Sequence, residues 1–142
     1  MKYLLALALI MFSLNLTIAP VPANHISMKD VQCLAANIHF EAQGESKKGK
    51  IAVGHVTLNR VNDPNFPKTI CSVVKQPGQF SWYAKADITK LKIPRATKQL
   101  AYEIVQGKYK DITLGAVYFH NGTVDAFKRK ITTKIGAHTF YS

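Results

Sequence analysis

The first clear pattern of apolar and polar positions follows the period of an α-helix. With Val31 set at zero and about 100° added per residue, three further apolar residues fall within about 40° of it: Ala35, Ile38 and Ala42. Ser27 suits an N-cap and Gly44 suits a helix end, so the pattern predicts a helix over residues 28–43. Because this helix is apolar on most of its sides, we expect it to lie at the centre of its domain.

Two more helices follow from the same periodicity. A helix over residues 47–61 would begin after Ser46 and carry apolar residues on two of its sides. Its remaining strip holds small or polar residues suited to facing a neighbour or a cleft: Ala52, His55 and Asn59. A further helix would run from Pro94, which suits a first turn, to Gly107, which suits a C-terminal end.

The other segments show different patterns. Residues 63–67 contain two prolines and predict a loop, residues 70–74 are apolar and fit a short helix or a strand, and residues 76–78 predict a turn. From residue 113 to 120 the pattern is β-like, Asn121-Gly122 is a strong turn signal, and residues 130–141 fit a second strand or a loop. The pattern therefore predicts an α+β fold, mostly helical, with a small C-terminal β element.

The first 23 residues differ from the rest of the chain. Lys2 precedes an unbroken apolar run over residues 3–12, and Val21-Pro22-Ala23 supplies compact residues at the −3 and −1 positions of a cleavage site. This arrangement predicts a secretory signal peptide at residues 1–23, followed by a single domain at residues 24–142. We therefore expect a protein that is secreted, or is located in the periplasm or the cell wall; the alternative is an uncleaved N-terminal anchor.

The chain is strongly basic. It has 19 Lys and Arg residues against eight Asp and Glu residues, a net charge of +11, and loss of Lys2 with the signal peptide would leave +11 − 1 = +10. The lysines are scattered and no nucleic-acid-binding motif occurs, so we do not expect nucleic acid as a partner. An exported basic protein meets anionic cell-wall polymers, and its charge raises the rate of encounter with them. We expect a monomer.

The chain has two cysteines, Cys33 and Cys71. An oxidising compartment permits a disulfide between them. Two buried free thiols fit the cysteine count almost as well, so the residues alone leave both states open.

Of the acidic residues, Glu41 and Glu45 are the two whose surroundings could perturb a carboxyl group. Glu41 lies at the margin of the apolar face of helix 28–43, one turn after Asn37. Desolvation disfavours a charged carboxylate and raises its pKa, and a carboxylic acid that stays protonated can protonate a leaving-group oxygen. This is the task of the acid in glycoside cleavage, although a glutamate at a helix end is more often a surface residue.

A zinc site is the rival interpretation. Four histidines could gather around a metal with Glu41: His39, His55, His120 and His138. No HExxH motif or similar local spacing supports such a site, and the spacing places His39 on a different side of the helix from Glu41. We expect no metal and no other cofactor, with a zinc-dependent amidase or peptidase as the alternative.

Several stretches in order resemble the SleB/CwlJ family of cell wall hydrolases, which includes spore cortex-lytic enzymes. They read CLAANIHFEAQGES, GKIAVGHVTLNRV, FPKTICSVVKQPGQFSW, GAVYFHN and IGAHTFY. The resemblance extends from about Cys33 to Tyr141 and is carried by the combination of motifs. It implies a lysozyme-like, lytic-transglycosylase-like catalytic domain that cleaves peptidoglycan between N-acetylmuramic acid and N-acetylglucosamine.

The resemblance also implies roles for individual residues. Glu41 corresponds to the catalytic acid/base, and both cysteines fall where exported members often carry them, which favours the disulfide. Gly44-Glu45 and Asn59-Arg60 match the family as well. Aromatic side chains would contact sugar rings, so we expect a substrate-binding set of Gln79, Phe80, Ser81, Trp82, Tyr118 and His120. Packing against helix 28–43 is the alternative role for each aromatic residue.

The sequence departs from the family at two places. Gln43 stands where the EARGE form of the motif has Arg, and Val124-Asp125-Ala126-Phe127 stands where a Pro-x-Trp is frequent, so one sugar contact is expected to differ.

The type of reaction depends on a second carboxyl group. A hydrolase needs one, for which Glu45 is the near candidate and Asp87 a more distant one. Because Glu41 is the single well-placed acid, we expect a lytic transglycosylase, in which the 6-hydroxyl of muramic acid attacks and an anhydro ring forms. A non-catalytic cationic wall-binding protein remains a further alternative.

Overall fold

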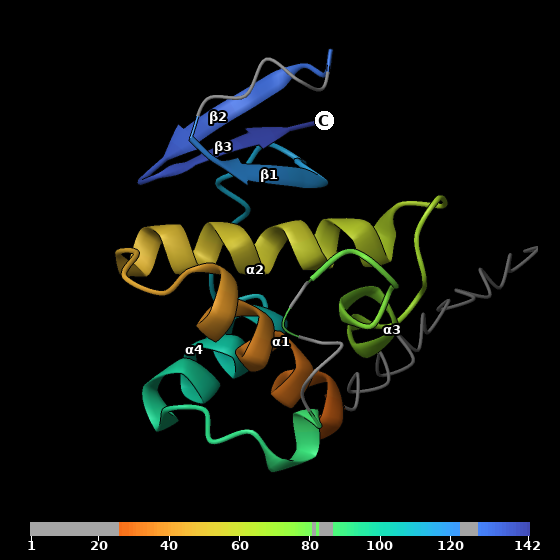
Figure 1. The fold of residues 1–142 in the computed structure, drawn as a ribbon, viewed down its shortest axis with the longest axis vertical. Helices are drawn as coiled ribbons and strands as arrows, with labels where there is room; N and C mark the ends of the chain where they lie inside the picture. The colour runs from red at the N-terminus through yellow and green to blue at the C-terminus, as the bar shows by residue number, and fades with distance from the viewer. Residues whose placement is uncertain (1–25, 81, 83–86, 123–127) are drawn as a thin grey trace, which may run out of the picture.

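The computed structural model describes residues 26–80, 82, 87–122 and 128–142, so the predicted signal peptide lies outside the described residues. Helical elements come first along the chain, and the strands follow (Figure 1). The helical elements are α1 (Met28–Glu41), α2 (Lys47–Asn62), α3 (Ile70–Val74), the short 3-10 helix η2 (Ile88–Lys90) and α4 (Arg95–Val105). The strands are β1 (Tyr118–Asn121), β2 (Ile131–Ile135) and β3 (His138–Tyr141). Within the described ranges, no helix is both long and apolar enough to cross a membrane.

The helices begin where the sequence predicts. The Ser27 hydroxyl caps α1 by accepting from the Asp30 amide at 3.3 Å, and Ser46 caps α2 by accepting from the Gly49 amide at the same distance. The helix α1 ends at Glu41, two residues earlier than predicted, and Gly44 turns the chain with a φ of 81°. Residues 70–74, for which two states were open, form a helix capped by Thr69.

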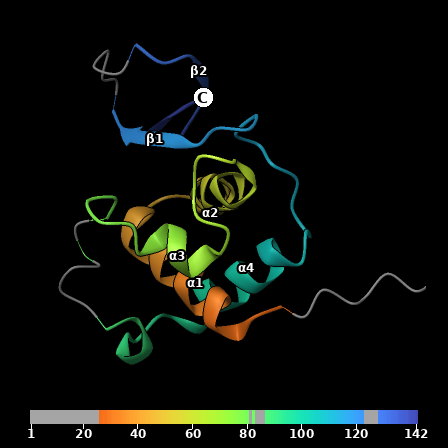
Figure 2. The ribbon, with the colours of Figure 1, turned by 90° about the vertical axis from the view of Figure 1, so that its right-hand side faces the viewer.

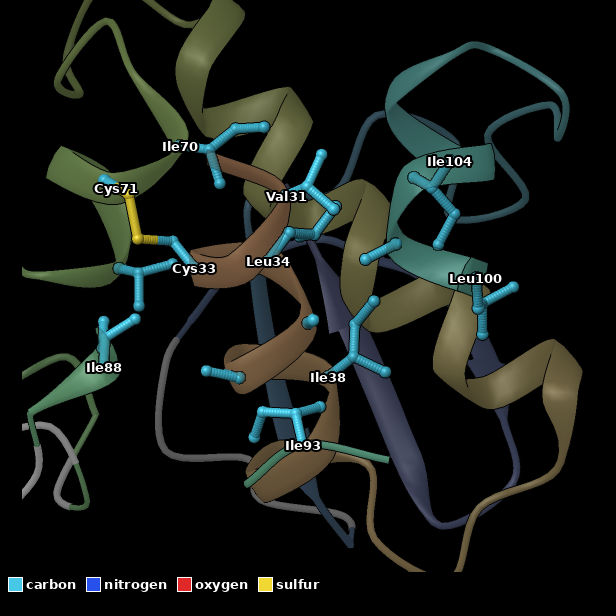
Figure 3. Packing of buried hydrophobic residues seen from close by; sticks show 14 of the residues in the cluster. Val31, Cys33, Leu34, Ile38, Ile70, Cys71, Ile88, Ile93, Leu100 and Ile104 are labelled. Carbon is cyan, nitrogen blue, oxygen red and sulfur yellow. A yellow bond between two sulfur atoms is a disulfide. The ribbon is translucent and has the colours of Figure 1, made fainter. Parts of the chain in front are cut away.

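The helix α1 lies at the centre of the helical part, as its apolar pattern predicts. Side chains from α3, η2 and α4 surround it, as Figure 3 shows for Ile70, Ile88 and Ile104. At the start of α1, Cys33 forms a disulfide with Cys71 of α3, and the Asp30 carboxylate accepts from the Cys71 amide at 2.9 Å. The disulfide favoured by the family resemblance is therefore confirmed, and it links two helices that pack together.

The strands form one antiparallel sheet in the order β1-β3-β2. The central strand β3 is buried along its whole length and pairs with both neighbours. Its Tyr141 lies opposite Tyr118 of β1, and its His138 lies opposite Ile135 of β2. The prediction of β structure from residue 113 is wrong at its start, because β1 begins at Tyr118. The tight turn between paired strands is at Gly136 rather than at Asn121-Gly122, and residues 130–141 contain two strands. The predicted class, mostly helical with a small C-terminal sheet, is confirmed.

The helix α2 separates the sheet from the other helices (Figures 1 and 2). A second, smaller group of buried residues joins α2 to the sheet: Ala52, Val56, Ala116, Ile135 and Phe140. The predicted polar strip of α2 faces a neighbouring segment. His55 contacts the carbonyls of Ile51 and Tyr109, and the Asn59 amide donates to Asp111, Thr113 and the Ala116 carbonyl. Asn59 thereby fixes the loop that leads into β1.

Candidate active site

Glu41 is the last residue of α1, and its side chain is half-buried. The indole Nε1 of Trp82 donates a hydrogen bond to its Oε1 at 2.9 Å. Burial raises the pKa of the Glu41 carboxyl, while the bond from Trp82 and the positive charge of Arg60 oppose that rise. Because burial prevails, Glu41 keeps its proton to a higher pH than an ordinary glutamate, which is the property expected of a general acid.

The Trp82 ring contacts two other aromatic side chains. Phe40 stacks on it with ring centroids 4.8 Å apart and an angle of 23° between the planes, and Phe80 lies tilted against it at 6.2 Å. Phe80 is 8% exposed and belongs to the main core, so its role here is packing. Trp82 and Phe40 are more exposed and adjoin the Glu41 carboxyl. At about 100° per residue, Phe40 falls on the side of α1 opposite Val31 and the main apolar face, and this is the signal in the sequence that it has a separate role.

Arg60 brings a buried positive charge to the same region. It lies in the last turn of α2 and is 5% exposed. Its Nε donates to the Val117 carbonyl at 2.7 Å, and its Nη1 donates to Oε1 of Gln79 at 2.9 Å. Asn59-Arg60 is part of the resemblance to the family, but the sequence indicates no function for Arg60, because its partners lie far away along the chain.

The remaining predicted substrate-binding residues lie in different surroundings. Gln79 is exposed and is bound to Arg60. Tyr118 of β1 is half-buried, with the Arg60 guanidinium 5.6 Å and the Arg129 guanidinium 3.5 Å from its ring centroid. His120 of β1 is exposed. Ser81 lies outside the described residues, as do residues 124–127, where the sequence departs from the family.

Glu45, the candidate second carboxyl, is engaged with the sheet. Its side chain is 13% exposed, and its Oε1 accepts from the Ala137 amide at 3.2 Å and lies 3.9 Å from Nδ1 of His138. Its carboxylate fills the space beside Gly136 so closely that a Cβ at that position would overlap it. Glu45 therefore attaches the β2–β3 turn to the start of α2. Asp87, the more distant candidate, is exposed and pairs with Lys90 at 3.5 Å.

The histidines of the rival zinc interpretation are dispersed. His55 is bound to two backbone carbonyls, His39 lies edge-on against Phe40, and His138 is buried in β3. Burial lowers the pKa of His138, as does the charge of His120, against the effect of Glu45 and of the Glu41 backbone. Among the described residues, no group of three or more His, Cys, Asp or Glu side chains is arranged to hold a metal ion.

A family profile, related sequences and solved structures all relate this chain to the same kind of protein. The sequence profile of the family described as Cell Wall Hydrolase matches residues 44–141. This match begins three residues after Glu41 and includes Glu45. A spore cortex-lytic enzyme of Bacillus cereus is 32% identical over 121 residues, and that of Bacillus subtilis is 37% identical over 62 residues, 44% of this chain and 20% of the relative.

Two solved structures resemble the chain throughout most of its length. The catalytic domain of the Bacillus cereus SleB protein superposes with a TM-score of 0.73 at 32% identity, covering 84% of this chain and 94% of that one. The catalytic domain of the germination-specific lytic transglycosylase SleB from Bacillus anthracis gives 0.74 at 32% identity, covering 86% and 100%. The Bacillus cereus match above covers 82% of this chain but 46% of the relative, so the chain spans less than half the length of that curated protein.

Proposed function

This chain belongs to the cell wall hydrolase family, and from that premise we propose that it is a peptidoglycan glycosidase with Glu41 as its general acid/base. The substrate would be the glycan strand, cut between N-acetylmuramic acid and N-acetylglucosamine. The names of the relatives support this, since one is a spore cortex-lytic enzyme and one solved domain is called a lytic transglycosylase.

The observation that carries the proposal is the half-buried Glu41 carboxyl under the Trp82 indole. In the protonated state, Glu41 would give its proton to the glycosidic oxygen as the bond to the muramic acid C1 breaks. The carboxylate that remains would be stabilised by the indole N–H and by the charge of Arg60. It would then accept the proton of the attacking hydroxyl, so that the same residue serves as acid and as base.

The surroundings of the other carboxyl groups support the lytic transglycosylase reaction over hydrolysis. Glu45 binds the Ala137 amide, and Asp87 is paired with Lys90 at the surface. Neither is disposed as a second catalytic carboxylate, which a hydrolase requires. In the proposed reaction the muramic acid's own 6-hydroxyl attacks C1 and loses its proton to Glu41. The product is a 1,6-anhydro ring, and no water is consumed.

We also propose the site of action. The predicted signal peptide at residues 1–23 and the disulfide support an exported protein that acts on the wall, and we propose that it does so as a monomer. The basic surface, which follows from the net charge of +11, would favour encounter with anionic wall polymers.

The test is the substitution Glu41→Gln, which keeps the shape of the side chain but removes its titrating proton. We expect loss of clearing in a zymogram of purified sacculi, with normal folding and wall binding. The matched control is Glu103→Gln on α4, a carboxylate that contacts Gln99, Lys108 and Tyr109 instead of the site; it should keep its activity. Clearing by Glu41→Gln at the level of the unmodified protein would reject the assignment and would favour the alternative, in which Glu41 is a surface residue and the catalytic group lies elsewhere.

A further inference from the structure

The burial of Arg60 requires an explanation, because a buried guanidinium is costly unless its N–H groups are satisfied. Its two hydrogen bonds reach Gln79, 19 residues away along the chain, and Val117, 57 residues away. One side chain thus joins α2 to the loop that precedes Trp82 and to the residue that precedes β1. Both of these acceptors lie outside α2, so the two hydrogen bonds link Arg60 to other parts of the fold.

Aromatic rings complete the surroundings of Arg60. The centroids of Phe66, Phe80 and Tyr118 lie 5.3, 5.9 and 5.6 Å from the guanidinium carbon, within the range of cation–π attraction. Phe80 belongs to the same loop as Gln79. Arg60 therefore contacts this loop twice, by a hydrogen bond to Gln79 and by the ring of Phe80, two residues before Trp82.

The position of Trp82 depends on that loop. Its ring contacts Phe40 of α1 and Phe80, and the indole N–H donates to Glu41 at 2.9 Å. Phe40 and Glu41 are fixed by α1, whereas Phe80 and Trp82 come from a loop that lies 41 residues away from Glu41. A displacement of this loop by even an ångström would lengthen the bond to Glu41 beyond hydrogen-bonding range.

We propose that Arg60 is the positioning residue of this site: it fixes the Gln79–Phe80 segment beside β1, and thereby the Trp82 indole that holds the Glu41 carboxyl. Arg60 need not touch the substrate. It also acts on Glu41 by its charge, which lowers the pKa of Glu41 in the same direction as the Trp82 bond does. The catalytic importance of this arrangement rests on the function proposed above, but the arrangement itself belongs to the free protein and is testable without substrate.

The chain offers a direct probe, because Trp82 is its one tryptophan. We expect the Trp82 emission of the complete protein to change with pH as Glu41 is protonated, and Glu41→Gln should abolish this change. Among the described residues, the charged or titratable groups near Glu41 include Arg60 of α2 and, toward the sheet, His138 with its neighbours Glu45 and His120. Any fluorescence change that persists in Glu41→Gln belongs to those groups and is subtracted.

Two substitutions separate the geometric from the electrostatic action of Arg60. Arg60→Lys keeps the charge but lacks the planar fork that binds two acceptors at once. It should increase quenching of Trp82 by acrylamide and lower kcat on sacculi roughly 10- to 100-fold, with little change in KM. Arg60→Met removes the charge as well, so the titration of Trp82 emission should also move to higher pH. Arg95→Met, at the exposed start of α4, is the matched control and should change neither property.

A folded Arg60→Lys protein with unchanged Trp82 quenching and unchanged kcat would overturn the proposal. If both Arg60 variants fail to fold, Gln79→Ala decides, because it breaks one bond to Arg60 from the exposed partner. Increased quenching of Trp82 in Gln79→Ala supports the proposal, and unchanged quenching overturns it. Cleavage of sacculi by Glu41→Gln would instead reject the proposed function, while the quenching data would still decide the role of Arg60.

Discussion

Removal of the Glu45 carboxylate should loosen the sheet without removing the chemistry. Glu45 precedes the Ser46 cap of α2 and accepts from Ala137 in the β2–β3 turn, and its side chain is 13% exposed. Glu45→Ala deletes this bond together with most of the side chain that fills the space beside Gly49 and Gly136. Glu45→Gln keeps an acceptor oxygen and nearly the same shape, so it serves as the matched variant.

The expected magnitude follows from these contacts. A hydrogen bond to a charged acceptor contributes about 1.5 kcal/mol at the low end of its range. The low end is used for this bond because Ala137 is exposed and water can replace the lost acceptor. Loss of packed methylene groups adds about 1 kcal/mol. Glu45→Ala should therefore lower the free energy of unfolding by about 2–3 kcal/mol, and the Tm by roughly 6–15 °C. Glu45→Gln should lower the free energy by about 1 kcal/mol or less.

The assay combines thermal unfolding, followed by far-UV circular dichroism, with cleavage of sacculi well below each Tm. Under those conditions both variants should retain most of their activity, because Glu45 is bound to the sheet and not to the substrate. A stable Glu45→Gln protein that loses activity as severely as Glu41→Gln would refute this reasoning. It would make Glu45 the second catalytic carboxyl and favour hydrolysis over the transglycosylase reaction.

Further predictions concern the disulfide, pH dependence and products. The Cys33–Cys71 disulfide has a sequence separation of 38, for which the chain-entropy relation gives a stabilisation of about 3.9 kcal/mol. Urea unfolding with and without reductant measures this stabilisation. Two freely alkylated thiols in native exported protein would contradict the disulfide. Since the pKa of Glu41 is raised above the ordinary glutamate value of 4.5, the folded protein binds more protons than the unfolded chain between these two pKa values, and stability falls as pH rises through that window. Above the pKa that Glu41 has in the folded protein, Glu41→Gln should therefore be more stable than the unmodified protein, and below pH 4.5 it should lose this advantage. If the two proteins have equal unfolding curves both above and below this range, the result would count against a buried carboxyl. The main products should be 1,6-anhydro-muropeptides, which mass spectrometry identifies as one water lighter and resistant to borohydride; mainly reducible muramic acid ends would indicate hydrolysis.

The helices could be predicted from the sequence because their signals are local. The apolar period of α1, the serine caps at Ser27 and Ser46, and the glycine at position 44 all act within a few residues of the element they define. The sheet could not be predicted to the same degree. Residues 113–117 have a strand-like composition, yet Asn59, more than 50 residues earlier, binds Thr113 and Ala116 and fixes this segment as a loop. The pairing of β1 with β3 rather than with β2 is also a long-range choice.

The same distinction applies to the candidate site. An acidic residue on an otherwise apolar helix is visible in the sequence, and so is an aromatic cluster in a polar loop. That Trp82 bonds to Glu41, and that Arg60 binds Gln79 and Val117, depends on segments that fold together from distant parts of the chain. The function of Arg60 was invisible for this reason. Glu45 looked like a second acid for the same reason, since its partner Ala137 lies 92 residues away.

The two separate apolar clusters on either side of α2 have a consequence for local unfolding. The sheet is attached to α2 by a small set of buried side chains, whereas α1 is surrounded by the larger core and tied to α3 by the disulfide. Free energies of local opening follow the apolar area that each unit buries. Amide hydrogens of β1–β3 should therefore exchange with deuterium through partial openings, whereas those of α1 should exchange through global unfolding. Glu41 would then stand on the slowly exchanging unit and Tyr118 on the faster one, so that the region between them could adjust to a bulky polymer while the acid stays fixed.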